Sequence, residues 1–209
     1  MITAIGDVMR RCYDKGWITT RDGNASLRRL NSPYIYVTPS GVRKNKIEVE
    51  SMIKLKMDNG QLIIPPGMKP SGELQMHYSL QRFSKSTRAV LHVHPTHVIA
   101  AMYAGWDLQV LSAQFPEISR YTKVAKNVPV LPVTSKELAH ATYFAMCEGS
   151  DKLTLSSPEN CVMYDIVGQD RHGICAVAAD PWSAYEHVER LDHVCEIVLK
   201  SGIKPSDTN

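Results

Sequence analysis

The chain has 209 residues, of which 44% are hydrophobic and 22% are charged, and its formal net charge is +3. This length suits one domain or two small ones, and the composition is that of an ordinary soluble globular protein. No basic helix favours polynucleotide binding, and no apolar run approaches the roughly 18–20 residues that span a bilayer, so we expect neither a nucleic-acid nor a membrane partner.

The first half of the chain alternates between helix and strand patterns. Apolar residues recur at helical spacing over residues 2–12, and Gly16 ends that helix. Residues 53–57 alternate apolar with polar side chains, and the turn sequence Asp58-Asn59-Gly60 predicts a hairpin. The elements predicted here are a helix over residues 2–12, strands over 25–30, 34–38, 53–57 and 61–64, a helix over 73–83 and a strand over 89–94.

The second half contains more helix signals. Thr134 and Glu137 form a T-x-x-E capping box. Asp180 followed by Pro181 is typical of a helix start, and Gly202 closes that last helix. The elements predicted here are helices over residues 98–103, 134–147 and 181–201, and strands over 128–133, 153–155, 161–166 and 174–178.

The order of these elements indicates the fold class. Hairpins fill the first third, and helices alternate with strands afterwards, without an internal repeat or a low-complexity linker. We therefore expect an α/β fold in which one three-layer domain over residues 1–203 has a mixed, mostly antiparallel sheet flanked by helices on both faces. Residues 204–209 are predicted to be a flexible tail.

Charged and sulfur-containing residues indicate the compartment. The densest basic cluster, residues 43–46, lies in a predicted turn, and we interpret it as a solvated loop. The five cysteines are scattered and form no C-x-x-C pair, so reduced, buried thiols are expected. The N-terminal segment lacks the pattern of a secretory signal. These features together favour a cytoplasmic protein.

The segment over residues 91–100 carries three of the eight histidines. His92 and His94 are two apart on a predicted strand, so their side chains point to the same side, and two imidazoles at that spacing can reach one divalent ion. Polar residues at a strand end are the alternative interpretation. A metal site needs a third protein ligand, and the candidates are His172 and Glu73. His97 begins the next helix and is interpreted as a surface or capping residue.

Four further histidines and three turns complete the set of polar candidates. The histidines at positions 77, 140, 187 and 193 lie in predicted helices, where core or surface roles are expected. Gly23-Asn24, Ser40-Gly41 and Ser71-Gly72 are turns that present short polar side chains and backbone N–H groups. The third turn precedes a helix, whose N-terminus favours anions. Together these turns could cradle a phosphate, although each alone is an ordinary turn.

Five ordered motifs carry a resemblance to a known family. They are Asp-Gly-Asn-Ala-Ser-Leu at residues 22–27, Thr-Pro-Ser-Gly-Val at 38–42, Lys-Pro-Ser-Gly-Glu at 69–73 followed by His77, His-Val-His-Pro at 92–95 and His-Gly at 172–173. With these motifs the chain resembles the class II aldolase/adducin family of sugar-phosphate enzymes over nearly its whole length. Within the family it is most similar to the L-fuculose-1-phosphate aldolases.

The resemblance implies a set of site residues. It implies that His92, His94 and His172 bind Zn²⁺ or another divalent ion such as Mn²⁺, Co²⁺ or Fe²⁺, and that Glu73 is the catalytic acid/base. It implies that the substrate phosphate is held by Asn24, Ser40, Gly41, Ser71 and Gly72. Tyr121 is the counterpart of a tyrosine that reaches the site from a neighbouring subunit and protonates the leaving aldehyde oxygen. The relatives form fourfold assemblies, so a homotetramer with interface active sites is expected.

The implied activity is cleavage of a phosphorylated ketose, similar to L-fuculose 1-phosphate, into dihydroxyacetone phosphate and an aldehyde through an enediolate. One departure is Gly72, where the aldolases often carry a second serine; another is the segment 156–171, which is longer than usual and could reshape the rim of the pocket.

Other activities stay open. A decarboxylase of a 3-oxo-tetronate 4-phosphate-like substrate is the first alternative, because residues 119–122 and Val128-Pro129 are weakly similar to that group. A dehydratase is a further alternative, and an epimerase is disfavoured because glutamate stands at position 73 where the epimerases typically have aspartate. A non-enzymatic, adducin-like interaction module is the alternative of a different class, disfavoured by the presence of all three histidines and Glu73. A cupin is disfavoured by the helices.

Overall fold

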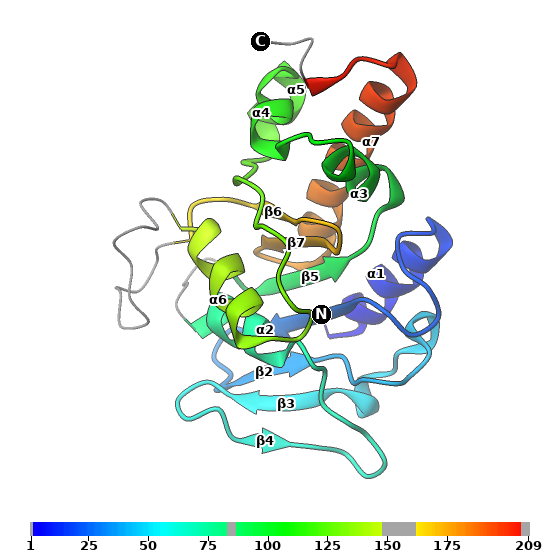
Figure 1. The fold of residues 1–209 in the computed structure, drawn as a ribbon. Helices are drawn as coiled ribbons and strands as arrows, with labels where there is room; N and C mark the ends of the chain where they lie inside the picture. The colour runs from blue at the N-terminus through cyan, green and yellow to red at the C-terminus, as the bar shows by residue number, and fades with distance from the viewer. Residues whose placement is uncertain (1, 83–86, 148–161, 206–209) are drawn as a thin grey trace.

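The structure is a computed structural model that describes residues 2–82, 87–147 and 162–205 (Figure 1). Its α-helices are α1 (Thr3–Asp14), α2 (Leu74–Arg82), α3 (Thr96–Tyr103), α4 (Leu108–Ala113), α5 (Pro116–Tyr121), α6 (Lys136–Ala145) and α7 (Pro181–Ser201). Its strands are β1 (Asn24–Arg28), β2 (Tyr34–Val37), β3 (Ile53–Lys56), β4 (Leu62–Ile63), β5 (Ala89–Val93), β6 (Ile166–Gln169) and β7 (Gly173–Ala178). Two short 3₁₀ turns, Lys44–Lys46 and Val49–Ser51, join β2 to β3.

These seven strands form one sheet in the order β4-β3-β2-β1-β5-β7-β6. Every neighbouring pair of strands is antiparallel. Among the described residues, parallel pairing occurs only in two isolated bridges, Val124 with Ile166 and Val128 with Gln169. The expected α/β class with a mostly antiparallel sheet is therefore confirmed. Strands β1, β5 and β7, which are distant in sequence, lie side by side at the centre (Figure 1).

Helices cover both faces of this sheet, as expected. Helices α1, α3 and α7 pack on one face, and α2 and α6 pack on the other (Figure 1). Side chains along β5 point alternately to the two faces of the sheet. Leu91 and Val93 belong to the core under α1, α3 and α7, whereas Val90 belongs to the core under α2 and α6. His92 has the parity of Val90 and therefore points toward the second face.

The first and last helices form where the sequence predicts them. In α1, Ile5, Val8, Met9 and Cys12 are buried along one stripe. Asp180 caps α7 by accepting hydrogen bonds from two backbone N–H groups of the first turn, and the helix ends at Gly202. Although α7 has 21 residues, none of the described helices combines the length and apolar character that a membrane crossing requires.

Two predictions around residue 130 are wrong. The described residues over 128–133 form no strand, and of these only Val128 makes a sheet bridge, because Pro129 and Pro132 lack the N–H group that a ladder needs. Thr134 is not the helix cap: Ser135 accepts the hydrogen bond from the Leu138 N–H group, and α6 starts at Lys136. Thr134 instead has a φ of 59°, a left-handed conformation that is rare for a β-branched residue.

The later strands differ in part from their predicted ranges. Strand β7 matches its predicted range nearly in full, whereas β6 starts at Ile166, where the predicted strand over 161–166 ends. The strand predicted over 153–155 lies outside the described residues, as does most of the predicted tail. Helices α4 and α5 have no counterpart in the sequence prediction, since each has only six residues and shows little periodicity.

The expectation that all five cysteines are reduced thiols is only partly correct. Cys12, Cys175 and Cys195 are free and buried. Cys147 is disulfide-bonded, so the expectation is wrong there, and Cys161 lies outside the described residues.

Candidate metal and phosphate site

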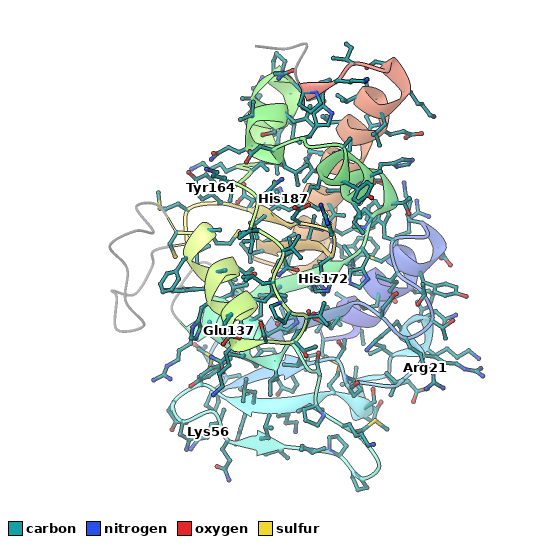
Figure 2. All side chains as sticks on the ribbon, in the orientation of Figure 1. Arg21, Lys56, Glu137, Tyr164, His172 and His187 are labelled. Carbon is teal, nitrogen blue, oxygen red and sulfur yellow. The ribbon has the colours of Figure 1, made fainter. Side chains whose placement is uncertain are left out.

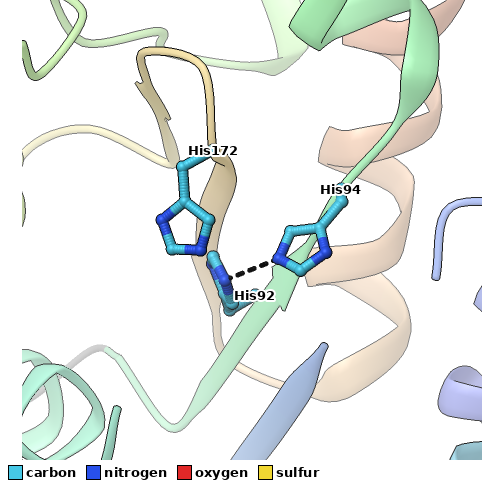
Figure 3. Close-up of side chains that lie close together, drawn as sticks. All are labelled: His92, His94 and His172. Atoms are coloured by element: carbon cyan, nitrogen blue, oxygen red, sulfur yellow. Dashed lines mark hydrogen bonds between the residues drawn. The ribbon is translucent and has the colours of Figure 1, made fainter. Parts of the chain in front are cut away.

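The three histidines of the predicted metal site meet at one end of the central strands. His92 lies in β5, His94 follows that strand directly, and His172 lies in the turn between β6 and β7. The antiparallel register places Val93 opposite Ile174, so the end of β5 meets the start of β7. The fold thus brings His172, labelled in Figure 2, to the other two imidazoles across a long stretch of sequence (Figure 3).

A close backbone approach makes this meeting possible. A Cβ atom at Gly173 would lie 2.5 Å from His94 Cδ2 and 2.6 Å from the Val93 carbonyl oxygen. Such distances are too short for any side chain, and the obstructing atoms include backbone, which cannot move aside easily. Glycine beside His172 therefore lets the turn approach His94, as the sequence suggests.

The histidine nitrogens form a compact group that suits a divalent ion. One ligand atom from each of His92, His94 and His172 lies within 4.8 Å of the others, and the two Nε2 atoms of His92 and His94 are 3.0 Å apart (Figure 3). Tetrahedral ligands at ordinary zinc–nitrogen distances are about 3.3 Å apart. The three side chains therefore need only small movements to share one ion.

The protonation of these imidazoles also suits a metal. His92 donates from Nδ1 to the Ile174 carbonyl oxygen at 2.9 Å, which leaves a lone pair on Nε2. Burial lowers the pKa of His92 well below its usual range, and the neighbouring His94 and His172 lower it further. Burial also lowers the pKa of His172, with Glu73 acting in the opposite direction and His94 adding to the decrease. Neutral imidazoles are the form that binds metals.

Glu73 stands beside the histidines, just before the first residue of α2. One carboxylate oxygen is 3.1 Å from His92 Nε2, and the other is 3.6 Å from His172 Nε2. The Asn24 side-chain amide donates to the first of these oxygens at 2.9 Å. Asn24 is the cross-strand neighbour of His92 in the β1–β5 register. The carboxylate can therefore reach either the ion or a bound ligand.

A cavity of about 270 Å³ joins these groups to the predicted phosphate turns. Its lining includes residues of all five sequence motifs: Asp22, Gly23, Asn24, Ser40, Ser71, Gly72, Glu73, His92, His94 and His172. The wall is completed by Arg21, Lys44, Val133 and Thr134. Arg21 is exposed at the outer rim, away from His172 (Figure 2). The cavity thus combines three possible metal ligands with the Glu73 carboxylate and two serine hydroxyls.

The two serine turns are held together by the backbone. The Ser40 N–H group donates to the Lys69 carbonyl oxygen at 2.8 Å, which bridges the loop after β2 to the loop before α2. The Ser71 hydroxyl accepts from the Glu73 N–H group at 3.2 Å, so its own hydrogen remains available to a ligand. These turns converge as the sequence predicts.

Thr134 explains why the second of these turns carries glycine. A Cβ atom at Gly72 would lie 2.7 Å from the Thr134 methyl carbon and 3.0 Å from its Cβ atom. The space of a second serine side chain is therefore occupied by a threonine from the loop before α6.

Two predicted residues lie outside the cavity. Gly41 follows Ser40 but is not among the described residues that line it. Tyr121 is at the end of α5 with 51% of its surface exposed, and the guanidinium groups of Arg120 and Arg190 stand over its ring. Within one chain, Tyr121 therefore does not contribute to this cavity. His97 is also apart, since its Nδ1 atom lies 3.3 Å from the Asp192 carboxylate, as expected for a histidine without a metal role.

Lys44 is the residue that the sequence interpretation misses. It belongs to the basic cluster interpreted as a solvated loop, but it is only 2% exposed and lines the cavity. Its ammonium group donates to the Pro39 carbonyl oxygen at 2.6 Å. Burial lowers the pKa of Lys44 to about 8, against the opposing effect of the Asp22 carboxylate. A buried cation beside two serine turns is well placed to attract an anion; only its position soon after the Ser40-Gly41 turn could have signalled this.

Known proteins share this sequence pattern and fold. The family profile described as the class II aldolase and adducin N-terminal domain matches residues 3–199. A Drosophila grimshawi protein named as a probable methylthioribulose-1-phosphate dehydratase is 29% identical over 66% of this chain and 66% of its own length. An L-fuculose phosphate aldolase of Methanococcus maripaludis is 26% identical over 94% of both chains. The solved structure of a sugar-phosphate aldolase from Thermotoga maritima superimposes with a TM-score of 0.77 at 22% identity, covering 98% of this chain and 97% of that one.

Proposed function

Because the chain belongs to the class II aldolase and adducin N-terminal domain family, we propose that it is a divalent-metal-dependent aldolase. Its substrate is a phosphorylated ketose similar to L-fuculose 1-phosphate, which it cleaves to dihydroxyacetone phosphate and an aldehyde. The observation that carries the proposal is the cavity in which His92, His94 and His172 face Glu73 and the two serine turns. Groups for anion binding and groups for proton transfer meet there within reach of one ligand.

Each group has a role in this proposal. When bound by the three histidines, a divalent ion such as Zn²⁺ supplies Lewis-acid stabilisation of the negative charge that develops on the substrate. Ser40, Ser71 and backbone N–H groups near Gly41 and Gly72 hold the phosphate, with the Lys44 charge behind them. Asn24 lies at the same wall, and its second amide hydrogen can serve the phosphate as well. Glu73 accepts and returns the proton at the reacting carbon or oxygen.

The role of Glu73 can be tested by substitution. Glu73→Gln removes the basic oxygen but keeps size and hydrogen bonding, so we expect full metal content and a loss of turnover of about 10²- to 10⁴-fold. Metal analysis and steady-state kinetics of the variant measure the two quantities separately. Near-normal turnover would remove Glu73 from the acid/base role.

We propose further that the chain forms a homotetramer with active sites at subunit interfaces. In this assembly Tyr121 of a neighbouring subunit protonates the leaving aldehyde oxygen. The half-exposed ring of Tyr121, which contacts two guanidinium groups outside its own chain's cavity, supports this arrangement. Light scattering gives the mass of the assembly, and Tyr121→Phe should lower turnover without changing that mass. A monomer with full activity would contradict the arrangement.

A dehydratase is the second candidate. It is favoured by the relatives named as methylthioribulose-1-phosphate dehydratases, of which the Drosophila grimshawi protein has 29% identity. An aldolase breaks a carbon–carbon bond, whereas a dehydratase removes water and keeps the carbon chain. Both reactions use the same phosphate and proton-transfer groups, and their products distinguish them.

Elemental analysis of the purified protein, paired with product analysis, tests the proposal. The panel contains L-fuculose 1-phosphate, other ketose 1-phosphates, methylthioribulose 1-phosphate and a 3-oxo-tetronate 4-phosphate. One divalent ion per chain with release of dihydroxyacetone phosphate is the expected result. Loss of water identifies the dehydratase, and release of carbon dioxide identifies the decarboxylase; either result overturns the aldolase. Neither metal nor product would leave an adducin-like interaction module.

A further inference from the structure

A continuous line of hydrogen-bonded side chains runs beneath the site, between β1 and α2. Its members are Glu73, Asn24, His77, Ser26 and Gln81, called here the polar relay. Glu73 accepts a hydrogen bond from Asn24 Nδ2 at 2.9 Å, and Asn24 Oδ1 lies 2.5 Å from His77 Nε2. On the other side of the imidazole, His77 Nδ1 lies 2.7 Å from Ser26 Oγ. Ser26 Oγ in turn accepts a hydrogen bond from Gln81 Nε2 at 2.5 Å. His77 and Gln81 are fully buried.

The spacing of these residues explains how they form a line. Glu73, His77 and Gln81 are four residues apart and therefore lie on one stripe at and along α2. Asn24 and Ser26 are two apart in β1 and therefore point to the same face of the sheet. The opposite side of β1 carries Ala25 and Leu27, which are core residues. The relay is thus a polar seam in an otherwise apolar helix–sheet contact.

The carboxylate at one end determines the direction of every hydrogen bond. An ionised carboxylate can only accept, so Asn24 must turn its NH₂ group toward Glu73 and its oxygen toward His77. His77 must then donate from Nε2, which leaves Nδ1 as an acceptor for the Ser26 hydroxyl hydrogen. Since Ser26 has only that one hydrogen, its oxygen accepts from the Gln81 NH₂ group.

At the far end of the relay, the fixed direction leaves one hydrogen-bonding atom of Gln81 without a partner in the described part of the chain. Gln81 Oε1 is buried and has no hydrogen-bond partner among the residues that the structure describes. Turning the Gln81 amide around would bring its oxygen to Ser26, which has no second hydrogen to give. The unpaired atom is the Gln81 oxygen, as this direction requires, because a relay of the opposite direction would leave the Gln81 NH₂ group unpaired instead.

We propose that His77 is a positioning residue: it anchors the Asn24 amide in the orientation that the Glu73 carboxylate requires, and thereby holds that carboxylate beside His92. A fixed amide donor keeps one Glu73 oxygen in place and leaves the other free toward the cavity. The inference rests on the proposed function only in giving Glu73 the acid/base role. The direction of the relay itself is independent of the reaction.

Nuclear magnetic resonance of the histidine side chains tests the relay without any substrate. In a ¹H–¹⁵N spectrum of the purified protein, we expect His77 to be neutral, with its hydrogen on Nε2 and its Nδ1 accepting a hydrogen bond. Burial lowers the pKa of His77 to about 3, so this signal should stay constant from about pH 8 to pH 6. Glu73→Gln should shift the Nε2–H resonance through Asn24. A hydrogen on Nδ1, or a resonance unaffected by Glu73→Gln, would overturn the relay.

Kinetics of two His77 variants test the positioning role. His77→Gln retains an N–H donor for Asn24, whereas His77→Leu has none. For the substrate that is turned over, we expect His77→Leu to lower kcat about 10- to 100-fold with little change in KM or metal content, and His77→Gln to recover most of the loss. Equal kcat values for the two folded variants would overturn the proposal. If His77→Leu does not fold, Ser26→Ala takes its place, because it removes the hydroxyl that donates to Nδ1 and holds the His77 ring against Asn24; an unchanged kcat there would also overturn the proposal.

A matched control distinguishes positioning from general stability. Thr142 in α6 is also fully buried on this side of the sheet, and its hydroxyl accepts from the Gln169 side chain at 2.8 Å. Thr142→Val removes this hydrogen bond and the one that the hydroxyl donates to the Leu138 carbonyl oxygen, both of them buried and outside the polar relay. We expect it to lower the melting temperature while leaving kcat and the His77 resonance unchanged. If Thr142→Val reduced kcat as much as the His77 variant, the effect would be one of stability, and the proposal would fail.

Discussion

The two faces of the central sheet differ in what the same strands place on them. The face under α1, α3 and α7 is closed by apolar side chains such as Leu27, Leu91 and Val93. The face under α2 and α6 shares its space between a smaller apolar core and buried polar groups, among them Ser26 and His77. Alternation along a strand thus lets one segment of chain carry an apolar core on one side and the polar groups of the candidate site on the other.

The largest effect on metal binding and turnover is expected from a substitution on the polar face of β5. His92→Ala should abolish bound metal and lower turnover by at least about 100-fold, since removing even the outer partners of metal ligands costs about 10- to 100-fold. The control is His97→Ala, which removes a histidine of the same segment that contacts Asp192 instead. Metal content by mass spectrometry and turnover are the measurements. Full metal occupancy in His92→Ala would refute the site.

Substitution of the adjacent residue, Leu91, tests the contribution of the apolar face to stability. Leu91 is 1% exposed and packs under α1, α3 and α7. Leu91→Ala should lower the free energy of unfolding by about 2–5 kcal/mol, because a cavity forms in a packed core. Metal stoichiometry should remain that of the parent protein. Urea denaturation and metal analysis check the two halves of this prediction, which fails if the variant loses metal while still folded.

Lys44 is expected to have opposite effects on the stability of the protein and on anion binding at the site. Its pKa is lower in the folded chain than in the unfolded one, so folding disfavours the charged ammonium group. The pKa falls from 10.5 to about 8, and a pKa change of one corresponds to roughly 1.4 kcal/mol. Lys44→Met should therefore raise the free energy of unfolding at pH 7 by up to about 3 kcal/mol, less the loss of the hydrogen bond to Pro39. The same variant should bind inorganic phosphate more weakly. Thermal denaturation and calorimetric titration measure the two effects. A variant that is less stable and binds phosphate normally would assign Lys44 to the scaffold.

Lowering the pH should lower the free energy of unfolding mainly through groups on the polar face. The pKa of His77 in the folded chain, about 3, lies below that of an unfolded histidine. The unfolded chain therefore binds one more proton between about pH 6.5 and pH 3, and this residue lowers stability by about 1.4 kcal/mol per pH unit as the pH falls through that window. His77→Gln should reduce the slope by this amount, whereas Leu91→Ala should lower stability equally at every pH. Urea midpoints at about pH 7, 6 and 5 give the slopes; identical slopes for parent and His77→Gln would contradict the prediction.

The same division explains what can be predicted from the sequence. Helix α1 and strands β5 and β7 are predictable because their apolar residues repeat with a clear pattern. The ordered motifs lead to the three histidines and Glu73, which the structure brings together. The burial of Lys44 and His77 is not predictable, because a charged or polar residue looks like a surface residue until the chain folds over it. The strand prediction at 128–133 fails for the opposite reason, since apolar residues there suggest a strand that two prolines prevent.

The contact between Gly72 and Thr134 constrains how this site can change over evolutionary time. A Cβ atom at position 72 would lie 2.7 Å from the Thr134 methyl carbon, so a serine there would force Thr134 to shift. Thr134 itself holds a left-handed conformation, with a φ of 59°, which glycine or asparagine would adopt more readily. The two positions are therefore coupled. A second hydroxyl in the Ser71-Gly72 turn requires the side chain at position 134 to move or to become smaller.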